Sequence, residues 1–139
     1  MAKAKPDLIG RQHAIKYLRE KYAGRPCDFK TADCMRMLRT LLVKRGHRVR
    51  FLPRYASQAG ALRALRQAGY SKLSEILDEL LPRITPARML PGDVAVMDDD
   101  VGIGTVVVFW GGDLFLGWHE GSNQAVFITA PAVSAAWRT

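Results

Sequence analysis

TADCMRMLRTLL, residues 31–42, is the stretch that decides the fold, because it predicts a buried helix with a cysteine at its start. Thr31 is a suitable N-cap, and Asp33 in the first turn suits the positive end of the helix dipole. The apolar side chains form a broad stripe at helical spacing, made of Cys34, Met35, Leu38, Leu41 and Leu42. Gly46 ends the helix, and the breadth of the stripe predicts substantial burial.

Cys34 is the candidate reactive residue. A thiol at a helix N-terminus lies where the dipole and the free backbone N–H groups favour the thiolate. The second cysteine, Cys27, precedes it by seven residues. We expect no disulfide between them in a cytosolic type of chain, and two cysteines without a CxxC pair make a poor zinc site. No metal or other cofactor is therefore expected.

Charge is distributed unevenly along the 139 residues. Residues 1–90 hold 20 Lys and Arg against 7 Asp and Glu, a net +13, whereas residues 91–139 hold one basic residue against six acidic ones, a net −5. Such asymmetry is typical of nucleic-acid binding, of assemblies with complementary charges, or simply of solvated helix faces. No apolar run is long enough to span a membrane, and the N-terminal residues lack the apolar core of a secretory signal.

Helical spacing dominates the first part of the chain, over residues 8–81. One helix is expected from about Arg11 to Tyr22, a third over residues 56–68, and a fourth capped by Ser71 and carrying leucines up to Leu81. Pro82 and Pro86 bound a predicted linker.

Strand-forming sequence follows, over residues 92–130. Strands are expected at 94–97, 103–110, 113–119 and 124–129, with a hairpin turn at Gly111-Gly112 and a short terminal helix over 131–137. Helices followed by an antiparallel meander predict a single α+β domain over residues 1–139, with the N-terminal helices packed on a C-terminal antiparallel sheet.

The order of these features resembles a known family. Gly24-Arg25-Pro26, Asp33-Cys34 at the start of a buried helix, Pro91-Gly92-Asp93-Val94 at the start of a strand, and then Val101-Gly102-Ile103 look like the NlpC-type papain-like cell-wall peptidases over roughly residues 12–130. The stretches ALRALRQAG at 61–69 and AWR at 136–138 look like an offshoot of that group found in phages near genes for tail-tip proteins.

The resemblance implies a papain-like fold and a three-residue site. Cys34 matches the nucleophile of the family, Asp100 stands where the family has its general-base histidine, and His119 falls near the third, orienting position. A carboxylate beside a thiol disfavours the thiolate and is a poor acid for the leaving amine at pH 7. The resemblance therefore implies an impaired site, unless His119 serves as a substitute base for Cys34.

Plainer interpretations of these residues remain open. A cysteine such as Cys34 is more often a small buried apolar residue than a nucleophile, and for His119, beside Trp118, a hydrogen-bonded surface or sheet-edge position is favoured over a base. The acidic run of residues 98–100 fits either a divalent-cation site or a solvated turn, and the turn is favoured because no complete ligand loop is visible.

The leading functional expectation is a structural component of a bacteriophage tail tip or tail hub, located in the virion and made in the bacterial host cytoplasm. Its partners would be other tail proteins and, in some cases, host peptidoglycan. The first alternative is an active peptidoglycan-cleaving cysteine peptidase or amidase that uses Cys34 with His119 during genome entry. A weaker alternative, a nucleic-acid-binding module, follows from the basic helical part alone, because the aromatic residues lie mostly in the acidic part.

Overall fold

The computed structural model describes residues 7–49, 55–99, 102–119 and 122–139 of the chain. Its helices are α1 (Leu8–Tyr22), α2 (Cys34–Lys44), α3 (Gln58–Gln67) and α4 (Leu73–Leu80), with a short 3-10 helix, η1 (Pro86–Arg88). Its strands are β1 (Arg83–Ile84), β2 (Val94–Met97), β3 (Thr105–Gly111), β4 (Leu114–Gly117), β5 (Val126–Thr129) and β6 (Val133–Trp137).

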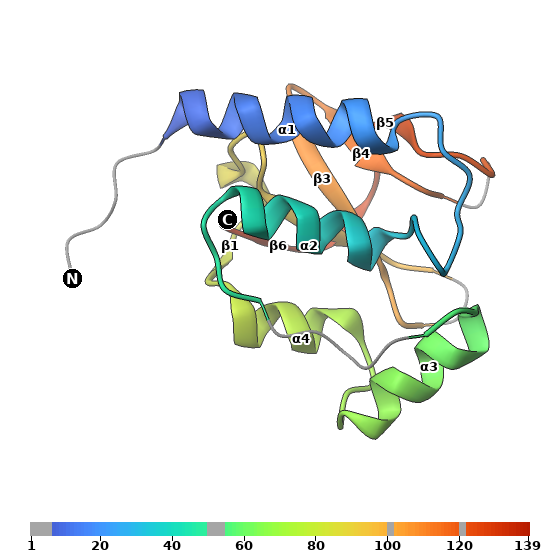
Figure 1. Ribbon diagram of the computed structural model, residues 1–139. Coiled ribbons are helices and arrows are strands. Elements are labelled where there is room, and N and C mark those ends of the chain that lie inside the picture. The colour runs from blue at the N-terminus through green and yellow to red at the C-terminus, as the bar shows by residue number, and fades with distance from the viewer. Residues whose placement is uncertain (1–6, 50–54, 100–101, 120–121) are drawn as a thin grey trace.

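The strands form one antiparallel sheet in the order β1-β6-β2-β3-β4-β5. Figure 1 shows α1 and α2 side by side across one face of this sheet, with α4 beside them and α3 at the outer corner. The expected α+β class, with helices packed on an antiparallel sheet, is confirmed. The predicted hairpin is present, but its turn is one residue later than expected. Gly111 ends β3, and Gly112 with Asp113 connects β3 to β4; both glycines have positive φ.

The alternation of side chains along the strands explains how the sheet is covered. Val94, Val96, Val106 and Val108 point into the core that the helices share, whereas Val107 packs into a smaller cluster on the opposite face. Because side chains on a strand alternate between faces, this division fixes the pairing register of β2 with β3.

The caps of two helices differ from expectation. Asp33, rather than Thr31, caps α2: its carboxylate accepts a hydrogen bond from the Arg36 N–H at 2.8 Å. Thr31 instead closes a turn with Asp28, to whose carboxylate its hydroxyl donates. At α4 the N-cap is Lys72, one residue later than predicted. The Glu75 carboxylate accepts hydrogen bonds from the backbone N–H groups of Ser71 and Lys72.

The terminal helix predicted over residues 131–137 is wrong, because this segment forms β6. Alanine is the best helix former, but intrinsic propensity is a small preference, and pairing on both sides, with β1 and β2, outweighs it. Ala136 and Trp137 become fully buried in this central position, and the Trp137 indole N–H donates to Asp78 at 2.9 Å. The sheet therefore extends beyond the predicted range of 92–130 at both of its ends.

Two smaller element boundaries also differ from the prediction. Helix α1 begins at Leu8, three residues before the expected start, because the Asp7 side chain accepts a hydrogen bond from the Gly10 N–H. The predicted linker between Pro82 and Pro86 contains β1. None of the helices in the described ranges is long and apolar enough to cross a membrane.

Gly104, just before β3, provides a first prediction. Its φ is +95°, and a Cβ placed there would lie 2.6 Å from Cγ1 of Val96. Gly102 also has a positive φ, of +80°, but has open space around it. We expect Gly102→Ala to cost about 1–2 kcal/mol for its backbone conformation alone. Gly104→Ala should cost about 1–3 kcal/mol more because of the clash. Urea unfolding measures both variants, and equal costs would contradict the close packing of β3 on β2.

Candidate functional site

Cys34 begins α2 at the point where this helix meets the sheet. The backbone N–H of Val106, in β3, donates a hydrogen bond to the Cys34 sulfur. The residue is partly exposed and lines a pocket of about 190 Å³, which α2, α3 and the start of β3 enclose together. The apolar part of the wall is contributed by Phe29, Met35, Leu62, Leu65, Leu73, Ile103 and Trp118.

The polar side of the pocket centres on the Asp33 carboxylate, which is almost fully buried. One oxygen accepts from the Arg36 guanidinium at 2.8 Å and from the Tyr55 hydroxyl at 2.7 Å. Burial and the hydrogen bond to Asp33 raise the pKa of Tyr55, so this phenol stays protonated and remains a donor. Asp33 is thus held by its neighbours as a structural cap.

The thiol of Cys34 is not activated by this environment. Burial raises the pKa of Cys34 to about 12; the Val106 hydrogen bond opposes the rise, and the Asp33 charge adds to it. Desolvation at this helix N-terminus thus outweighs the backbone N–H groups that favour the thiolate. Burial, Asp33 and Asp28 also raise the pKa of Cys27, which lines the same pocket.

The structure does not place Cys34 and His119 in one pocket. His119 lines a neighbouring hollow together with Met97, Asp98, Asp99, Thr105, Ile128 and Ala132. Asp99 and Thr105 also line the pocket of Cys34, so the two hollows adjoin. Trp118, the residue before it, packs into the helix-side core, where its ring meets Tyr22 edge-on at 6.0 Å. No histidine is among the described residues that line the pocket of Cys34.

Asp100, the third expected site position, lies outside the described residues. The part of the acidic run that is described behaves as a turn: the Asp99 carboxylate accepts from the Ile103 N–H at 3.0 Å, and its carbonyl accepts from the Gly102 N–H. Within the described ranges, no group of three or more His, Cys, Asp or Glu side chains is placed to hold a metal ion.

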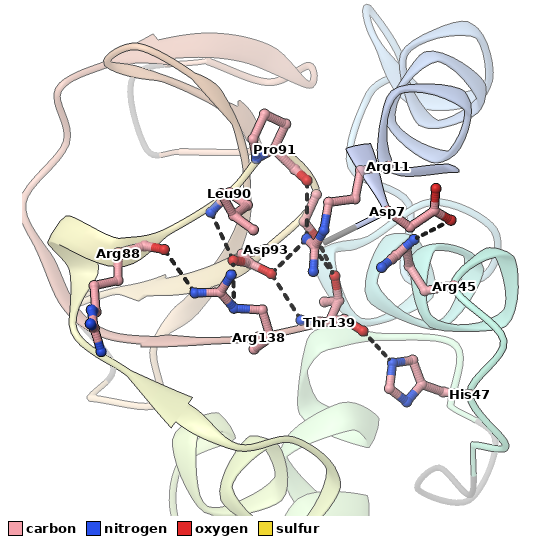
Figure 2. Close-up of polar contacts among 11 residues, drawn as sticks. Asp7, Arg11, Arg45, His47, Arg88, Leu90, Pro91, Asp93, Arg138 and Thr139 are labelled. Carbon is pink, nitrogen blue, oxygen red and sulfur yellow. Dashed lines mark hydrogen bonds and ion pairs between the residues drawn. The ribbon is translucent and has the colours of Figure 1, made fainter. Parts of the chain in front are cut away.

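A buried cluster around Asp93, shown in Figure 2, was not predicted from the sequence. Asp93 is fully buried, and one of its oxygens accepts from Arg11 at 2.8 Å and from the Thr139 N–H at 2.9 Å. The other oxygen accepts from the Leu90 N–H at 2.8 Å and pairs with Arg138 at 3.4 Å. Since these contacts occupy both oxygens, Asp93 is a structural anchor that joins α1, the start of β2 and the end of β6.

Thr139 completes this cluster. Its hydroxyl donates to the Gly92 carbonyl at 2.7 Å, and its own carbonyl oxygen lies 2.6 Å from Nε2 of His47. Residues separated by more than 80 positions in the sequence thus meet here. The only signal in the sequence was the Gly92-Asp93 pair before a strand, which does not reveal its partners.

A search of curated proteins finds no significant match to this chain. One family model, described as a domain of unknown function (DUF6950), matches residues 9–139. This range includes all the helices and strands described above apart from the first residue of α1, and with them the Cys34 pocket and the Asp93 cluster. The chain therefore belongs to the family of the domain of unknown function DUF6950.

Proposed function

We propose that the chain is a structural component of a bacteriophage tail tip or tail hub, with a papain-like fold of the NlpC type whose cysteine site is impaired. The observation that carries the proposal is the placement of Cys34. It begins a buried helix that is pressed against a central strand of an antiparallel sheet, yet its thiol remains protonated. In the peptidases that the sequence resembles, the same position requires an activated thiol.

The composition of the pocket supports the impaired site. A cysteine nucleophile needs an imidazole within hydrogen-bond reach to take its proton and pass it to the leaving amine. The described polar groups that line the pocket of Cys34 are carboxylates, a protonated phenol, a second thiol, an amide and a hydroxyl, and no imidazole is among them. Within the described residues, such a wall favours the neutral thiol and provides no imidazole for it.

The assignment to a phage tail rests on the sequence resemblance, and both stretches that carry it have structural roles. Residues 61–69 include most of α3, which forms one wall of the Cys34 pocket, and residues 136–138 end β6 with the buried Trp137. Both stretches therefore contribute packing, and neither contains one of the candidate site residues. Other tail proteins are the proposed partners, and the virion tail is the proposed location after synthesis in the host cytoplasm.

Incubation with purified peptidoglycan tests the impaired site. We expect the chain to release no stem peptides above background, and Cys34→Ala to behave identically, because no histidine is among the described residues that line the pocket of Cys34. Mass spectrometry of the soluble products makes the measurement. Cleavage that disappears in Cys34→Ala would instead support the active peptidase, with His119→Ala showing whether that histidine takes part.

The tail assignment needs a separate measurement. Peptides of this chain should be found in purified particles of a phage that encodes it, and deletion of its gene should yield particles with defective tail tips in electron micrographs. Normal tails that lack the chain would refute the assignment, whatever the outcome with peptidoglycan.

A further inference from the structure

A basic hollow of about 430 Å³ lies between α1 and α2, away from the Cys34 pocket. Tyr17, Lys21 and Tyr22 contribute one side from α1, and Arg36, Arg39, Thr40, Val43 and Lys44 contribute the other from α2. No carboxylate is among the described residues that line it. The hollow therefore presents cations and hydroxyl groups to whatever approaches these helices.

Three of these cations are available to a ligand. Arg36 is engaged by Asp33, but Lys21, Arg39 and Lys44 are exposed and have no ion pair within the described residues. The Lys44 ammonium lies 4.1 Å from the centre of the Tyr17 ring, which holds it at the hollow without neutralising its charge.

Apolar side chains continue the same surface. Of the five large apolar residues that are exposed in the described chain, four lie on these two helices: Leu8, Ile9, Tyr17 and Val43. Tyr17 and Lys21 are four residues apart and so lie on one face of α1, and Ile9 lies two turns before Tyr17 on the same helix. Ile9 is 73% exposed and Val43 58% exposed, although side chains of this kind are usually buried.

We propose that this surface docks a segment of another protein in which carboxylates stand beside apolar side chains, an acidic amphipathic segment. Carboxylates would pair with Lys21, Arg39 and Lys44, and apolar side chains would cover Ile9 and Val43. A nucleic-acid backbone supplies the negative charge but offers nothing apolar to these two residues. The surface has this chemistry whether or not the chain is part of a phage tail.

The probe that tests the docking surface is a synthetic helical peptide with Leu at positions i, i+3, i+4 and i+7 of its repeat and Glu on the opposite face, so that it carries one apolar and one acidic stripe. Oligoglutamate of the same length and a short DNA duplex serve as comparisons. We expect the peptide to bind most tightly and to shift the amide NMR signals of Tyr17, Val43 and Lys44. Arg39→Glu/Lys44→Glu should weaken binding by about tenfold or more. Val43→Ser should weaken binding of the peptide but not of oligoglutamate.

The matched control is Arg63→Glu/Arg66→Glu, which makes the same change in net charge at exposed positions of α3. This variant should bind the peptide with nearly unchanged affinity. If the control lost as much affinity for the peptide as Arg39→Glu/Lys44→Glu, net charge alone would explain the effect, and the proposal would be overturned. Tighter binding of the duplex, equal binding of oligoglutamate, or no binding of the peptide at millimolar concentration would overturn it too.

Discussion

Asp93→Ala should lower the free energy of unfolding by about 3–5 kcal/mol, one of the largest effects that we expect from a single substitution in this chain. The substitution removes the acceptor of two cations and two backbone N–H groups. Arg11, itself only 3% exposed, then keeps a buried charge without its carboxylate. Leaving a buried charge uncompensated costs more than the pair contributes while it is intact.

Urea unfolding followed by circular dichroism measures the loss. Asp113→Ala is the matched control, because Asp113 is exposed in the turn between β3 and β4, and we expect it to change stability by less than about 0.5 kcal/mol. Arg11→Met combined with Asp93→Ala should be less destabilising than the sum of the two single changes, because the double variant buries no unpaired charge. If Asp93→Ala cost no more than Asp113→Ala, the cluster would not be an anchor.

Alkylation of Cys34 should be about a thousandfold slower in the folded chain at pH 7 than in the chain unfolded in guanidinium. Only the thiolate reacts, and raising the pKa from 9.0 to about 12 lowers the thiolate fraction by about three powers of ten. The rate should still rise about tenfold for each pH unit between 7 and 10. Mass spectrometry of the iodoacetamide adduct, in a Cys27→Ala background, follows Cys34 alone.

The sign of the accompanying stability change is fixed by the same pKa. The folded state holds the Cys34 proton more tightly than the unfolded state. The protonated thiol therefore contributes fully to the free energy of unfolding below about pH 9, and this contribution is lost as the pH rises toward about 12. Cys34→Ala should remove this part of the pH dependence. A labelling rate that levels off near neutral pH would instead reveal an activated thiolate and would contradict the impaired site.

Local sequence patterns predicted most of the elements of this fold. The apolar spacing that indicated helices in residues 8–81 depends only on neighbours within two turns, and the apolar, β-branched composition of 94–97 and 103–110 is equally local. The segment 131–137 was assigned wrongly for the same reason. Its alanines look helical in isolation, and only its position between β1 and β2 makes it a strand.

For the candidate site too, the sequence predicted local features but not which distant residues meet. The sequence placed Cys34 at the start of a buried helix, and the structure agrees. It offered His119 as a companion because of order along the chain, but the two residues line different hollows. Asp93 was only part of a motif in the sequence, and its partners Arg11 and Thr139 are 82 and 46 residues away.

The sequence by itself therefore determined the α+β class, the helix that begins at Cys34 and the contrast between a basic helical part and an acidic sheet part. Only the tertiary structure decided that Cys34 keeps its proton, that residues 133–137 complete the sheet and that Asp93 anchors three distant segments. The physical reason is the separation along the sequence over which each kind of interaction acts. Periodicity and capping act between residues a few positions apart, whereas desolvation, strand pairing and buried ion pairs depend on which surfaces the folded chain brings together.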